Sequence, residues 1–166
     1  EPFNPLRVKI GLGKYNYARH TIFWSSDGSK KLSFNWNGEY GKYFDGKLNT
    51  TTFKINFSPI PHIALNASVN RNNFKGVGTE KTNKTVDLMA VEGRLALNPR
   101  FQLIGFYQKD LSQNANNYNI RLSWEYQPLS FLYLVFNNRQ FDSTLRPETR
   151  AREDHAIAKI SYLKQF

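Results

Sequence analysis

The chain has 166 residues, which suits one domain or a piece of a larger one. It contains no cysteine, which excludes a disulfide framework, a zinc ribbon, an iron–sulfur cluster and a thiol nucleophile. The formal net charge of +10 favours polyanionic partners such as nucleic acid, anionic lipid or lipopolysaccharide. The mean hydropathy is −0.59 and no run of 18 apolar residues occurs, which excludes a transmembrane helix. Membrane β-strands are not excluded, because only every second residue of such strands is apolar.

Apolar and polar residues alternate along most of the chain, and a period of two is typical of β-strands. Abundant aromatic residues argue against disorder, abundant asparagine argues against long helices, and no segment has a convincing helical pattern. We therefore expect an all-β protein of nine or ten strands. In chain order the strand-like segments are residues 6–12, 15–25, 32–40, 51–58, 63–70, 89–97, 101–108, 120–126, 131–138 and 156–166.

The connections between these segments form a second pattern. Compact turns with Pro, Gly, Asn or Asp are predicted at residues 26–29, 58–61, 98–100 and 127–130. The connections between them are a short one at residues 44–47 and long polar ones near residues 72–84, 110–117 and 142–154. This alternation predicts an antiparallel up-and-down meander with one plain end and one elaborate end.

Three features favour a transmembrane β-barrel, or the closing part of a larger one, over a soluble barrel. The strands are about ten residues long, which matches a tilted membrane strand. Aromatic residues lie near the strand ends, where the girdles of a membrane barrel occur. The chain ends in an alternating strand whose last residue, Phe166, resembles the signal for insertion into the bacterial outer membrane.

The alternation divides the strand residues into two predicted surfaces. Lipid-facing candidates share the apolar phase: Phe53, Ile55, Phe57, Leu65, Val91, Leu95, Ile120, Leu122, Trp124, Ile160 and Tyr162. Lumen-facing candidates share the polar phase: Lys54, Asn56, Glu92, Arg94, Arg121, Glu125 and Lys159. We expect the charged members of the second set to form an ion-pair network with Glu39, because unpaired buried charges are costly.

Several segments resemble an uncharacterised family of outer-membrane β-barrels from Bacteroidetes. The segments that carry the resemblance are residues 58–63, 98–101, 121–128 and 132–137. Members of that family usually have a carbohydrate-binding-family-9-like module before a large barrel. The resemblance covers most of residues 15–166 and implies that this chain is the carboxyl-terminal part of a longer barrel. It implies no catalytic residues.

The chemistry-bearing residues do not predict an enzyme. His20, His62 and His155 lie far apart, and we expect no metal site and no cofactor. Paired carboxylates for hydrolysis would require Glu92 and Glu125 to face one substrate, but the segment 101–108 separates their strands.

We therefore predict an integral outer-membrane protein of a Gram-negative bacterium, with a role as structural barrel, anchor or transport component. The expected partners are the lipid bilayer, lipopolysaccharide, the remaining amino-terminal part of the barrel or other outer-membrane proteins. Nucleic acid is not an expected partner, because the basic residues do not gather on one face. The alternatives are a soluble lipocalin-like β-barrel that binds a small ligand, and a hydrolase built on a membrane barrel.

Overall fold

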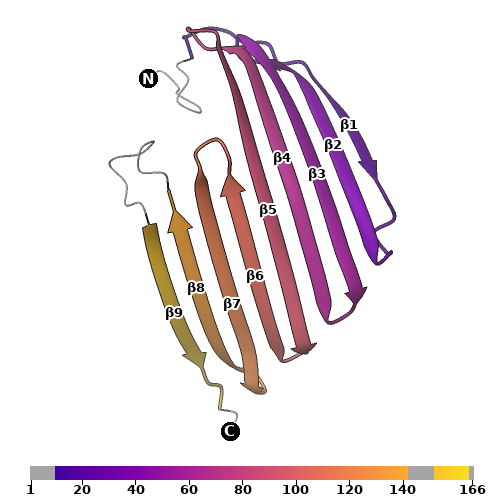
Figure 1. Ribbon diagram of the computed structural model, residues 1–166, viewed down its shortest axis with the longest axis vertical. Coiled ribbons are helices and arrows are strands. Elements are labelled where there is room, and N and C mark those ends of the chain that lie inside the picture. Colours follow the sequence, from indigo (N-terminus) through magenta and orange to yellow (C-terminus); the bar gives the residue numbers. More distant parts are fainter. Residues whose placement is uncertain (1–9, 142–151, 165–166) are drawn as a thin grey trace.

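The computed structural model describes residues 10–141 and 152–164. These residues form one antiparallel sheet of nine strands, whose order in space follows their order in sequence (Figure 1). The described part of the chain has no helix long and apolar enough to cross a membrane. The strands are β1 Arg19–Ser25, β2 Leu32–Tyr43, β3 Gly46–Ile60, β4 Ile63–Val77, β5 Thr82–Asn98, β6 Phe101–Asp110, β7 Ala115–Gln127, β8 Ser130–Gln140 and β9 Arg152–Ser161.

The predicted all-β antiparallel meander is confirmed, with nine strands. Most of the proposed extra strand at residues 6–12 lies outside the described residues, and its described part, from Ile10 onward, is not in a strand. The sheet is open, since β1 pairs only with β2 and β9 pairs only with β8. The closure that defines a barrel is therefore not a feature of this sheet.

Strands β3, β4 and β5 are 15, 15 and 17 residues long, and they extend into a segment predicted to be a loop. Polar residues within 72–84 are typical of loops, but Asn73 pairs with both Asn49 and Thr85 in the sheet. The true connection is only residues 78–81. The strand ladder is formed by backbone N–H and C=O groups, which asparagine and threonine also provide, so composition alone misplaced this boundary.

Two other predicted loops are also shorter than expected. Residues 110–117 reduce to the connection 111–114, because β7 already begins at Ala115. The predicted loop at 142–154 lies mostly outside the described residues, and β9 begins inside it at Arg152.

The sheet has two distinct ends. At one end, which we call the turn end, lie the connections 26–31, 61–62, 99–100 and 128–129. At the other, the loop end, lie 44–45, 78–81 and 111–114 (Figure 1). The connection 26–31 is longer than expected for the plain end, but β8 ends and β9 begins at the loop end, separated by residues 141–151, so the longest interval between strands lies at the end predicted to be elaborate.

Among the described residues a conventional core is almost absent. The buried hydrophobic residues are Ile10, Leu48, Phe74 and Val77, which cluster at the loop end where the segment before β1 packs on the sheet. Tyr15, Tyr43, Phe44 and Val86 pack around this cluster. Elsewhere no second layer covers the described sheet, so its large apolar side chains remain exposed, which is unusual for a soluble domain.

Candidate functional site

The strand register divides the sheet into two chemically different faces. Directly paired residues lie on the same side of an antiparallel sheet, and alternate residues along a strand share a side. The row Trp36, Phe53, Val69 and Met89 therefore belongs to one face, which we call the apolar face. The row Asn56, Asn66 and Glu92 belongs to the opposite face, which we call the polar face.

The strand residues predicted to face lipid all lie on the apolar face. They are Phe53, Ile55, Phe57, Leu65, Val91, Leu95, Ile120, Leu122, Trp124 and Ile160. The last candidate, Tyr162, follows the end of β9 and is not part of the sheet. Exposed fractions of 41% for Phe57 and 49% for Ile120 show that no other element covers this face among the described residues.

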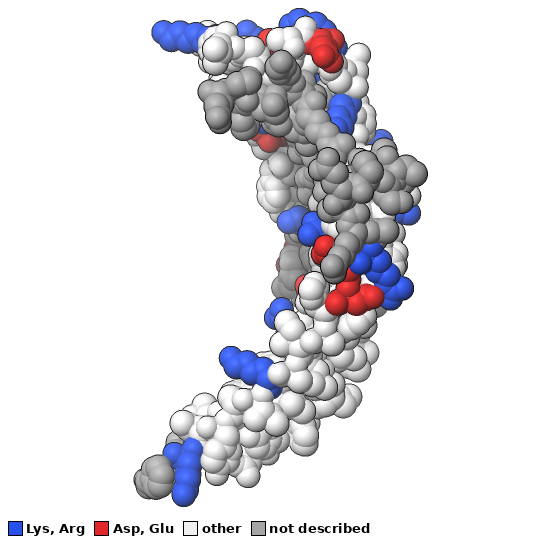
Figure 2. All heavy atoms as spheres, turned by 90° about the vertical axis from the view of Figure 1, so that its left-hand side faces the viewer, with Lys and Arg blue, Asp and Glu red and all other residues white. Residues whose placement is uncertain are grey.

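Along the apolar face an uncharged band runs from the turn end towards the loop end. On β2 to β5 its last row is formed by the paired residues Trp36, Phe53, Val69 and Met89. Met89 lies opposite Lys109, so on β6 and β7 the band ends two residues nearer the turn end, at the paired Tyr107 and Tyr118, and on β8 it ends at Phe136. No Asp, Glu, Lys or Arg of the described strands lies on this face within the band. Seen from the side, the molecule curves, and below the charged cluster near its middle the outer side shows almost no charged side chains (Figure 2).

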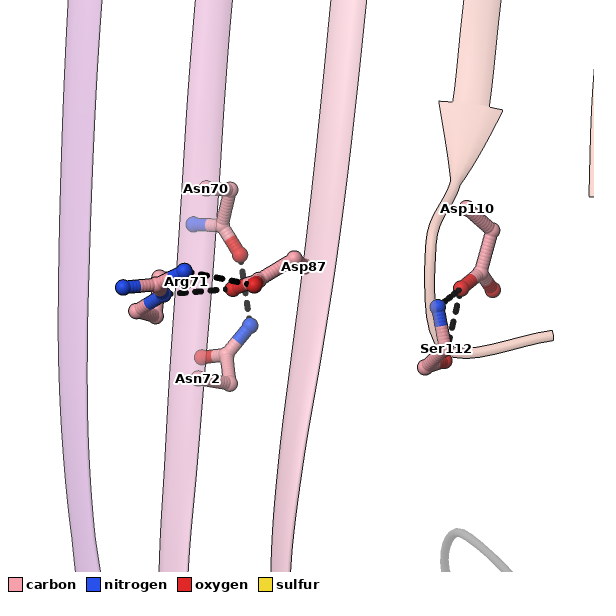
Figure 3. Close-up of polar contacts among 6 residues, drawn as sticks. All are labelled: Asn70, Arg71, Asn72, Asp87, Asp110 and Ser112. Carbon is pink, nitrogen blue, oxygen red and sulfur yellow. Dashed lines mark hydrogen bonds and ion pairs between the residues drawn. The ribbon is translucent and has the colours of Figure 1, made fainter. Parts of the chain in front are cut away.

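Charged residues appear on the apolar face directly beyond the band. Arg71 of β4 lies two residues beyond Val69, on the same face, and is directly opposite Asp87 of β5. Its guanidinium donates two hydrogen bonds to the Asp87 carboxylate, of 2.7 and 2.8 Å (Figure 3). Lys109, opposite Met89, and Asp154, which accepts a 2.8 Å hydrogen bond from Arg152, continue this rim on β6 and β9.

The residues predicted to face a lumen all lie on the polar face. They are Lys54, Asn56, Glu92, Arg94, Arg121, Glu125 and Lys159. The polar face also carries apolar side chains on β6 and β8, where Phe131 stacks on Tyr133 at 5.6 Å between ring centroids.

The expected ion-pair network does not form among these residues. Glu92 accepts a 3.3 Å hydrogen bond from Asn66, and Glu125 accepts one of 2.9 Å from the backbone N–H of Leu129 in the adjacent turn. Arg94 lies opposite Ile104, which in turn lies opposite Arg121, so the register separates the charges. Glu39 pairs instead with Arg19 of β1, at 2.8 Å.

Asparagine and threonine side chains connect the polar face where ion pairs were expected. The Thr50 hydroxyl donates to Asn72 at 2.8 Å, the Asn72 amide to Asn70 at 2.5 Å, and the Asn70 amide to Thr52 at 2.7 Å. Figure 3 shows the contact between Asn70 and Asn72. Asn119 of β7 similarly donates to Asn137 of β8. Alternate asparagines in the sequence were the available signal for this network.

The described histidines and carboxylates form no catalytic or metal-binding cluster. His62 Nδ1 contacts the carbonyl oxygen of Ala96 at 2.7 Å, and His20 packs on Tyr40 with ring centroids 5.1 Å apart. Within the described part of the chain, no group of three His, Cys, Asp or Glu residues could hold a metal ion. Glu92 and Glu125 lie on strands separated by β6.

Comparison with known proteins leaves the family open. The chain matches no protein-family model, no curated protein and no solved structure. The predicted resemblance to an outer-membrane family therefore stays a prediction, as does the role of Phe166, which lies outside the described residues.

Proposed function

We propose that the chain is part of an integral β-barrel of a bacterial outer membrane and that its role is structural, anchoring or transport rather than catalytic. The observation that carries this proposal is the exposed, uncharged apolar band on the face opposite a polar, hydrogen-bonded one. If water contacted both faces of the sheet, the apolar band would be exposed to water. Lipid against the apolar face and a water-filled interior against the polar face would suit the chemistry of each face.

The dimensions of the band are compatible with a bilayer. From Met89 to Leu97 the apolar face of β5 spans eight residue steps, or about 26 Å along the strand at roughly 3.3 Å per step. A strand tilt of about 40° reduces this to about 20 Å across the bilayer, close to the roughly 25 Å of an outer-membrane band. The rim of Arg71, Asp87 and Lys109 would then lie at the polar boundary.

The two open edges of the sheet are a reason to expect additional strands in the complete barrel. All eight strand pairs are antiparallel, so β1 and β9 run in the same direction. Direct pairing of β1 with β9 would be parallel, whereas bacterial barrels of this kind have an even number of antiparallel strands. One additional strand, or a larger odd number of strands, would close the barrel with antiparallel pairs only. These strands would come from the remaining part of the barrel or from another outer-membrane protein.

Neither alternative function gains support from a specific contact. A lipocalin-like barrel would direct its apolar face to an enclosed interior, but here the apolar face is the more exposed one. A hydrolase would require converging nucleophile and base side chains, whereas on the described polar face Glu92 and Glu125 accept hydrogen bonds from amides and Glu39 pairs with Arg19.

Adjacent residues of β5 test the proposal directly. Val91 lies in the middle of the apolar band, and Ala90 lies next to it on the polar face. For the chain folded in phosphatidylcholine vesicles, we expect Val91→Lys to lower the free energy of unfolding by about 2–4 kcal/mol, the cost of Lys near the bilayer midplane. The matched variant Ala90→Lys should change it by less than about 1 kcal/mol, as for a solvated surface.

Urea titration followed by circular dichroism measures both free energies. Equal small effects of the two variants, or a wild-type chain that stays monodisperse in buffer without detergent, would contradict the membrane proposal.

A further inference from the structure

Three lysines lie side by side at the loop end of β2, β3 and β4. The register places Lys42 directly opposite Lys47, and Lys47 directly opposite Lys75. Cβ atoms of directly opposed residues are only about 4.5–5.5 Å apart, and like charges in such pairs are destabilising. The sheet therefore brings together three positive charges that repel one another.

Nearby acidic groups do not neutralise this row. The carboxylate of Asp45, in the connection between β2 and β3, already accepts hydrogen bonds from the Gly78 N–H at 2.8 Å and from Lys81 Nζ at 3.0 Å. Among the described residues, the ion pairs of this chain involve none of Lys42, Lys47 or Lys75. The row thus has an excess of positive charge with exposed ammonium groups.

A hollow of about 690 Å³ adjoins the row, a volume within the range of about 300–1,000 Å³ that is usual for ligand sites. Lys14, from the segment before β1, and Lys81 complete its basic lining, and the rings of Tyr15 and Phe44 form part of its wall. The hollow therefore combines five lysines with a single aspartate already in use.

Backbone packing holds the lysines together despite their repulsion. A Cβ atom on Gly46 would lie 2.5 Å from the carbonyl oxygen of Lys75, so only glycine allows this close approach of β3 to β4. Phe44 has a φ of 52°, a left-handed conformation that costs free energy in a residue other than glycine. Its ring is fixed edge-on against Tyr15 and Tyr43, with centroids 5.4 and 4.8 Å apart.

We propose that this lysine row is a binding site for a ligand that carries clustered phosphate groups. Strands are about 4.8 Å apart, so the row spans about 10 Å and can meet more than one phosphate. Ammonium groups bind phosphate as mobile point charges, and a bound polyanion would offset the repulsion within the row. The same chemistry occurs in a phosphorylated lipid headgroup and in a soluble oligophosphate.

Calorimetry with the whole chain in non-ionic detergent tests this site. Pyrophosphate serves as the soluble probe, and mixed micelles of the same detergent and phosphatidylcholine, with or without lipid A, serve as the lipid-linked probe. The variant Lys42→Gln/Lys47→Gln removes two charges from the row, and the control Lys30→Gln/Lys31→Gln removes two from the connection 26–31 at the turn end.

We expect the first variant to weaken binding of at least one probe about tenfold or more, and the control to change it less than about twofold. If the first variant weakens the binding of pyrophosphate, the phosphate ligand is a soluble one. If it weakens the binding of lipid A alone, the phosphate ligand is a lipid headgroup. In low salt without a ligand, the first variant should also unfold at a higher temperature than wild type, since it removes repulsion.

Equal weakening by both double variants would show a general charge effect and overturn the proposal, as would an absence of binding to both probes. Because pyrophosphate binding requires no bilayer, its result is independent of whether the chain inserts into a membrane.

Discussion

Asp45 is the residue that ties two connections of the loop end together. Its carboxylate accepts hydrogen bonds from Gly78 and Lys81, so the connection 44–45 is fixed to the connection 78–81. The Gly78 N–H, followed by the Lys81 ammonium, lowers the pKa of Asp45 below its ordinary value of 3.8. The contact therefore favours the ionised carboxylate.

A lowered pKa in the folded state predicts the direction of the pH effect. The contribution of Asp45 to the free energy of unfolding should be complete above its ordinary pKa of 3.8, and lost as the pH falls through the lower folded pKa. Asp45→Asn should therefore destabilise the chain at neutral pH and differ little from wild type in strong acid.

Thermal unfolding of both chains across this range measures the difference. Asp27 in the connection 26–31 provides the control, since its partner Ser29 lies in the same turn and Asp27→Asn should leave the loop end unchanged. A constant difference between wild type and Asp45→Asn at every pH would contradict the role given to the ionised group.

At the scale of single strands, alternation predicts which face a residue takes but not its neighbours across the sheet. The polar phase of Glu92, Arg94 and Arg121 was readable because side chains alternate with a period of two. Their pairing depends on the stagger between strands, which the turns determine and which local sequence does not encode. For that reason the prediction of an ion-pair network was wrong, and asparagine side chains form the contacts across the polar face instead.

The strand boundaries were unpredictable for a different reason. At the loop end the strands extend well beyond the apolar band, and there polar residues occur on both faces without regular alternation. Asn72 and Asn73 of β4 are examples, and such residues lack the hydrophobic period that marks a strand. The lysine row was not predicted for the same reason, because Lys75 was assigned to a loop and not to a strand.

The two edge strands give a prediction at this scale. With the chain alone in detergent, amide hydrogens of β1 and β9 should exchange faster than those of β4, because each edge strand has only one neighbour. Hydrogen exchange followed by mass spectrometry of peptides measures this order. Equal protection of β1, β4 and β9 would show that the edges are paired and would contradict the proposed need for additional strands.

At the scale of the whole molecule, the average composition conceals two surfaces. A mean hydropathy of −0.59 is that of a polar protein, yet the register gathers large apolar side chains on one face over most of the sheet. The excess of basic residues is likewise divided, with Lys54, Arg94 and Arg121 on the polar face and the lysine row at the loop end. Each surface thus suits a different environment.

Tryptophan fluorescence tests the membrane proposal most directly, because all three tryptophans of the chain lie on the apolar face. Trp24 is opposite Trp36 near the edge of the apolar band, and Trp124 lies towards the turn end. In vesicles whose lipids carry bromine on the acyl chains, we predict strong quenching of the emission and little quenching by aqueous iodide. Emission that iodide quenches fully and brominated lipid leaves unchanged would contradict the account.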